Sequence, residues 1–142
     1  MNRGSDPRIA HFVRDTLGCN CPEPVFDRIV LHVGGAGRMI ASIEVGGRLL
    51  IRLVDADRGL DIAQQLGAAV QPGVVERDSR GFNRFRLVLL ASAAEAWIAR
   101  AEQAFRRLPR RDALTYLHIL EPAAVAGFLP RWRLRRSASF PL

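Results

Sequence analysis

The chain's only two cysteines, Cys19 and Cys21, are separated by a single residue. Their type and close spacing make them the strongest candidates in the chain for a reactive or metal-binding site. Pro22 follows directly, and proline is favoured as the first residue of a helix. We therefore expect Cys21 at a helix start, where the helix dipole and free N–H groups lower the pKa of a thiol. A thiolate attacks disulfides and binds soft metal ions. The pair is our candidate catalytic site and our candidate metal site.

The sequence leaves three interpretations of Cys19 and Cys21 open. The pair forms a redox centre, in which the small C-x-C ring would make a disulfide easy to reduce. Alternatively, it gives two ligands to zinc or an iron–sulfur cluster, and the remaining ligands come from a second subunit of a homodimer or from His11, His32 and His118. In the third interpretation, both cysteines pack as small, inert hydrophobic side chains in a tight corner.

The segment 17–26 reads LGCNCPEPVF. It resembles a motif, LGCxCPxxVF, of small uncharacterised prokaryotic proteins. The resemblance covers about a dozen of the 142 residues and implies a site at this corner, without implying an activity. Pro24 departs from the acidic or helix-favouring residue expected there.

Positive charge is concentrated at the C-terminal end. All the basic residues are arginines, and residues 106–142 hold eight of them against two acidic residues, which gives +6 of the net charge of +7. A basic segment of this kind binds a nucleic acid, an anionic lipid or an acidic protein surface, or forms a solvated tail. The alternative function is thus a non-catalytic interaction domain that holds an anionic partner through Arg131, Arg133, Arg135 and Arg136.

Composition is that of one globular domain, with 49% hydrophobic and 25% charged residues. We expect a single domain over residues 1–130 and an Arg-rich tail over 131–142. The N-terminus lacks the apolar core of a secretory signal, and two cysteines are too few for a disulfide scaffold, so we expect a cytoplasmic protein. The longest apolar stretch, 113–130, contains Glu121 near its middle and does not suit a membrane span.

Periodicity and turn residues predict an α+β, two-layer domain. It has an N-terminal helical pair, a mixed four-stranded sheet and C-terminal helices over one face of the sheet. The predicted helices span 7–17, 22–28, 58–70, 93–108 and 112–120, with a further turn after Pro122. The predicted strands span 29–33, 39–45, 48–54 and 85–90.

A two-residue turn at Gly46-Gly47 predicts a hairpin in which Val45 lies opposite Arg48. The face of this hairpin that carries the bulkier apolar set is assigned to the core, under the helices at 58–70 and 93–108. Its members are Ile40, Leu49, Ile51 and Leu53.

Overall fold

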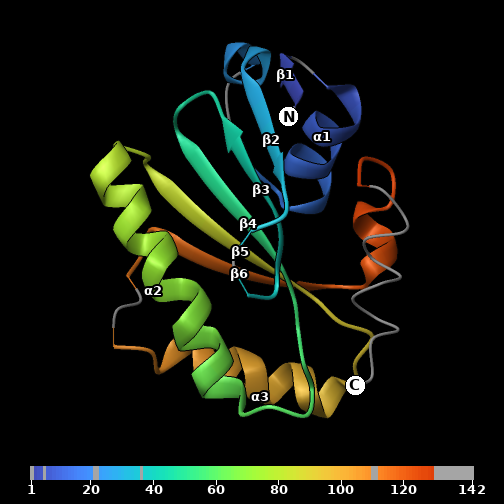
Figure 1. The fold of residues 1–142 in the computed structure, drawn as a ribbon, viewed down its shortest axis with the longest axis vertical. Coiled ribbons are helices and arrows are strands. Elements are labelled where there is room, and N and C mark those ends of the chain that lie inside the picture. The colour runs from blue at the N-terminus through green and yellow to red at the C-terminus, as the bar shows by residue number, and fades with distance from the viewer. Residues whose placement is uncertain (1, 5, 21–22, 36, 110–111, 130–142) are drawn as a thin grey trace.

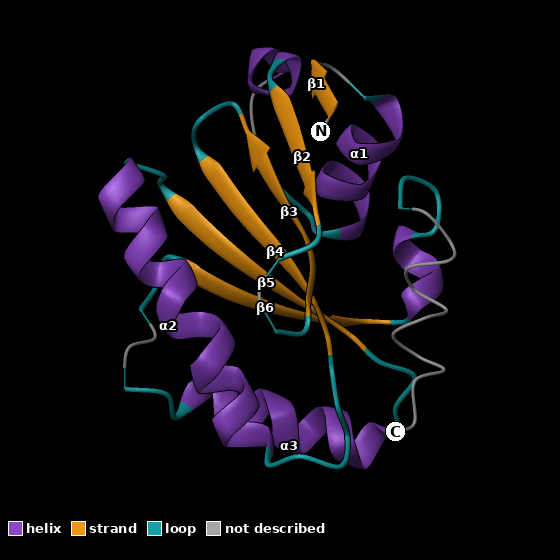
Figure 2. Ribbon diagram, viewed as in Figure 1, coloured by secondary structure: helices purple, strands orange, loops and turns teal. Residues whose placement is uncertain are grey.

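Six strands pair in chain order into one mixed sheet, in a computed structural model that describes residues 2–4, 6–20, 23–35, 37–109 and 112–129 (Figures 1 and 2). The first four strands are antiparallel neighbours, and the last three run parallel to one another. This confirms the α+β class and the mixed sheet, whereas the predicted number of strands was too small. The strands are β1 (Asn2–Gly4), β2 (Ile29–Val33), β3 (Met39–Val45), β4 (Leu49–Asp55), β5 (Arg84–Leu90) and β6 (Thr115–Leu120).

Helical segments cover both faces of the sheet. The two long helices, α2 (Ile62–Arg80) and α3 (Glu95–Arg106), connect β4 to β5 and β5 to β6, as parallel strands require. On the other face, α1 (Pro7–His11) continues as the π-helix η1 (Phe12–Thr16), and the short 3₁₀ segments η2 (Glu23–Asp27) and η3 (Pro122–Val125) are also on this side (Figure 1). The chain therefore forms three layers, and the predicted two-layer arrangement was wrong.

Two hydrophobic cores follow from this arrangement. One joins the strands to α1, η1 and η3, and it includes the predicted core residues Ile40, Leu49, Ile51 and Leu53. The other lies under α2 and α3. The hairpin face was thus correctly predicted to be buried, but it is covered by the N-terminal helices and η3. The sheet is buried on both sides, so the hydrophobic pattern alone did not show which helices cover which face.

The hairpin register differs by one residue from the prediction. Gly46 and Gly47 have φ of 59° and 68°, as a tight turn requires, but Val45 pairs with Leu49. Arg48 is left in the connection, outside the ladder. Its carbonyl accepts hydrogen bonds from the backbone N–H groups of Asn83 and Arg84, at 2.7 and 3.2 Å. The extra residue therefore ties the hairpin turn to the start of β5.

Helix α2 is longer than its sequence predicts. Gln71-Pro72-Gly73 indicates a helix end, yet the helix continues to Arg80 and ends at Gly81, whose φ is 77°. Val70 and Val74, one turn apart on either side of the proline, are both buried. The continued burial of this helix face stabilises the helix and offsets the loss of the backbone hydrogen bond that a proline cannot donate.

The segment 112–120 was predicted to be a helix and is a strand from Thr115 onwards. Asp112 accepts a hydrogen bond from the N–H of Leu114, which shapes the turn before β6. The buried Arg77 of α2 binds this turn, with Nη1 and Nη2 donating to the two Asp112 carboxylate oxygens at 2.9 and 2.6 Å. This contact with α2 and the parallel pairing with β5 override the local helical pattern.

Candidate functional site

Cys19 lies in the corner that follows η1. Gly18 has a φ of 72°, which ends the helix, and the N–H of Cys19 donates to the carbonyl of Val13 at 3.1 Å. Cys19 is buried and disulfide-bonded. Cys21 and Pro22 lie outside the described residues, so the predicted place of Cys21 at a helix start stays a prediction.

Cys19 lines a pocket of about 350 Å³ at the amino ends of β4 and β5. The polar groups around it come from four parts of the chain. Asn20 follows Cys19, Arg48 lies in the hairpin turn, Asn83 and Arg84 stand at the start of β5, and Arg86 and Tyr116 lie on β5 and β6. No carboxylate lines this pocket within the described residues. We call it the arginine pocket, defined by Arg48, Arg84 and Arg86.

Arg86 is the most deeply buried of the three arginines, with 9% of its surface exposed. Its Nη1 donates to the carbonyl of Leu17 at 3.0 Å and to Nε2 of His118 at 2.8 Å. Its guanidinium lies 4.6 Å from the centre of the Tyr116 ring. Burial lowers the pKa of Arg86, and the charge of Arg84 acts in the same direction. Arg86 therefore carries a poorly solvated positive charge.

His118 complements this arginine as a neutral acceptor. A guanidinium has only donors, so Nε2 of His118 accepts and the ring proton lies on Nδ1. Burial, with the charge of Arg86 as the second cause, lowers the pKa of His118 to about 4. The histidine is thus held neutral, and it does not balance the charge of the arginine.

The other arginines with largely buried side chains are paired with carboxylates. Arg77 binds both oxygens of Asp112, and Arg52 binds Glu76. In the described part of the chain, Arg86 has no carboxylate partner, and its buried Nε has no hydrogen-bond acceptor. Burial of an uncompensated charge is costly. The arginine pocket is therefore the place in the described fold where a buried positive charge lacks its counterion.

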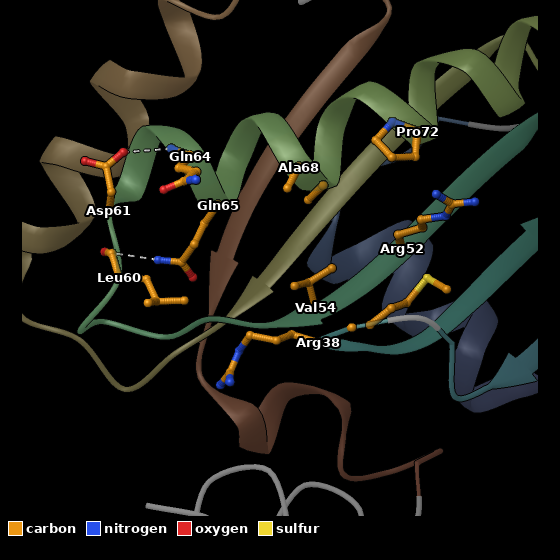
Figure 3. A pocket seen from close by; sticks show the side chains of 12 residues that line it. Arg38, Arg52, Val54, Leu60, Asp61, Gln64, Gln65, Ala68 and Pro72 are labelled. Carbon is orange, nitrogen blue, oxygen red and sulfur yellow. Dashed lines mark hydrogen bonds between the residues drawn. The ribbon is translucent and has the colours of Figure 1, made fainter. Parts of the chain in front are cut away.

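A larger pocket, of about 580 Å³, lies between the first half of α2 and the strands β3 and β4 (Figure 3). Its charged side chains already have partners within the chain. Arg38 Nη2 donates to Asp55 at 2.9 Å, Arg52 is held by Glu76, and Asp61 caps α2 by accepting from the N–H of Gln64 at 2.9 Å. This pocket offers a mainly apolar surface, and it is a weaker candidate for chemistry than the arginine pocket.

The histidines that were considered as partners of the cysteines are engaged elsewhere. His11 contacts Asp15 at 2.6 Å, His32 lies 3.5 Å from Glu44, and His118 binds Arg86. No three metal-ligating side chains cluster in the ranges that the structure describes. The predicted anion-binding residues Arg131, Arg133, Arg135 and Arg136 lie in the segment 130–142, outside those ranges, as does the predicted tail.

Comparisons of the chain with protein-family models, with curated proteins and with solved structures find no match. Across the helices that are described, none combines the length and apolar content that crossing a bilayer requires.

Sequence reasoning identified Cys19 and missed the arginine pocket beside it. One signal was available, because Arg86 stands inside the strand 84–90, whose last four residues are all apolar. A charged residue at a core position of a strand indicates either a buried ion pair or a functional site.

Proposed function

We propose that the protein is a thiol–disulfide redox protein whose centre is the pair Cys19 and Cys21. The observation that carries the proposal is the position of the disulfide-bonded Cys19 in the wall of the arginine pocket. An inert structural cysteine would need no such surroundings. A cysteine that cycles between disulfide and thiolate gains from them, because guanidinium groups stabilise negative charge on sulfur.

The reaction we propose is exchange with a partner that carries two thiols. A partner thiolate attacks one sulfur of the protein disulfide, and a mixed disulfide forms while the other protein sulfur leaves as a thiolate. The second partner thiol, after losing its proton, attacks the mixed disulfide and releases the partner as a disulfide. Two electrons reach the protein, and both of its cysteines end as thiols or thiolates. The arginine pocket favours the step in which negative charge develops on the leaving sulfur.

Equilibration of the intact protein with mixtures of reduced and oxidised dithiothreitol tests this proposal. Free thiols are trapped by alkylation and counted by mass spectrometry. We expect one reversible transition between zero and two alkylated cysteines. The variants Cys19→Ser and Cys21→Ser should each show one alkylated cysteine at every potential. A native protein that is alkylated twice even in fully oxidised dithiothreitol would contradict the proposal.

A further inference from the structure

We infer that the arginine pocket is a binding site for a small phosphate-bearing molecule. The inference rests on the pairing of charges around Arg86 and does not depend on redox chemistry at Cys19. Arg86 is nine-tenths buried, lines the pocket and lacks a carboxylate partner within the described chain. Its hydrogen bonds through Nη1 go to a neutral carbonyl and a neutral imidazole. An anion in the pocket would supply the missing counter-charge.

The other two arginines strengthen this assignment. Arg48 and Arg84 are exposed, and neither forms an ion pair with a described residue. Some exposed arginines elsewhere do, as in Arg80 with Glu44 at 2.8 Å and Arg8 with Asp6 at 3.2 Å. Three arginines therefore line one pocket with no described acidic residue among its lining.

The backbone structure brings the three arginines of the pocket together. The Arg48 carbonyl is held by the N–H groups of Asn83 and Arg84, so the hairpin turn and the start of β5 are tied together. Arg84 and Arg86 stand two residues apart on β5, which places their side chains on the same face of the strand. The site is thus built around the hairpin turn and the start of β5, which backbone hydrogen bonds hold together.

A phosphate group fits this chemistry best. A phosphate monoester carries a charge of about −1.5 to −2 at neutral pH and has three strong acceptor oxygens. Guanidinium forks match these oxygens in paired, charge-assisted hydrogen bonds. Asn20 and Asn83, whose side chains carry amide donors, also line the pocket. A volume of about 350 Å³ exceeds the size of the phosphate group alone and leaves room for a small organic portion.

Calorimetric titration of the full chain with pyrophosphate at low salt tests the inference. We expect saturable binding of one ion per chain. Arg84→Gln should weaken binding about tenfold, as expected for the loss of one charge-assisted hydrogen bond. Arg48→Gln should act in the same direction. Both side chains are exposed, so these variants should keep the fold. Citrate, a carboxylate of high charge, is titrated in parallel.

Two matched controls remove the same charge elsewhere. Arg100→Gln alters an exposed arginine of α3, and Arg58→Gln alters an exposed arginine in the connection between β4 and α2. Both should bind pyrophosphate like the native chain. The double variant Cys19→Ser/Cys21→Ser should also bind it, which separates this inference from the proposed redox function. Absence of saturable binding at 10 mM pyrophosphate, equal weakening by a control and by Arg84→Gln, or binding of citrate alone would each overturn the inference.

Discussion

Replacement of His118 by glutamine should remove part of the acid sensitivity of the fold. In the native protein, the His118 ring accepts a hydrogen bond from Arg86 and must lose that role on protonation. Glutamine retains an acceptor oxygen and does not ionise. The variant therefore changes the titration at this position while it keeps a hydrogen-bond acceptor beside Arg86.

The sign and size of the effect follow from the pKa of His118. Its folded-state value of about 4 lies below the ordinary 6.5, so the unfolded chain binds the extra proton between these two values. The contribution of His118 to stability is present above pH 6.5 and is lost as the pH falls towards 4. For full shielding from water, the change from pH 7 to pH 4.5 would lower the free energy of unfolding by about 2.4 kcal/mol. Because the ring is only half-buried, we expect about 1 kcal/mol.

Urea unfolding at pH 7 and at pH 4.5, followed by circular dichroism, measures this difference. The native protein should lose about 1 kcal/mol more between the two conditions than His118→Gln does. The raised pKa of Asp55 and the lowered pKa values of Asp6 and Asp112 affect both proteins alike and cancel in the comparison. His11→Gln, at an exposed position, serves as the control. Equal acid sensitivity of the native protein and His118→Gln would refute the reasoning.

Two further substitutions test the cores. Leu53→Asp places a charge in the fully buried core under α1 and η1, and it should unfold the domain, as judged by far-ultraviolet circular dichroism. Val33→Asp, at a position 37% exposed, should stay folded. Gly73→Ala puts a methyl group into the ring of Phe85 and should lower the free energy of unfolding in urea by about 1–3 kcal/mol. Gly67→Ala in the same helix meets nothing nearer than 3.9 Å and should raise that free energy by about 0.5–1 kcal/mol. A folded Leu53→Asp or a stabilised Gly73→Ala would show that the packing is misassigned.

Local signals in the sequence were sufficient for several elements. Asp6 caps the helix predicted to begin at residue 7, with its side chain accepting from the N–H of Arg8 at 2.9 Å, and Gly18, directly after the predicted helix end, has a positive φ. The strands at 29–33 and 39–45 have the predicted bounds. In each case, the residues within a few positions determine the conformation.

Elements that depend on distant partners were predicted poorly. Strand β6 owes its conformation to pairing with β5, and α2 continues past Pro72 because its inner face stays buried. The missed strand β1 has three residues, which is too short for a periodic pattern. Long-range packing decided these elements, and it is not visible in a local window of sequence.

The candidate site likewise combines a residue that local sequence signals point to with residues that only the fold brings together. Cys19 was identified from sequence because its chemistry and spacing are local. The arginines beside it come from the hairpin turn and from β5, and their proximity depends on hydrogen bonds between Arg48 and the start of β5. Whether these arginines are paired with counterions also depends on which carboxylates lie near them. Only the folded structure shows this.

The central claim is that the disulfide at Cys19 and the arginine pocket form one site. The midpoint potential of the disulfide in Arg84→Gln, compared with that in the native protein and in Arg100→Gln, tests it most directly. Loss of a positive charge from the pocket that Cys19 lines should destabilise the thiolate, so the potential of Arg84→Gln should fall by about 5–20 mV. That of Arg100→Gln should match the native value. Identical potentials in all three proteins, measured to within a few millivolts, would contradict the claim.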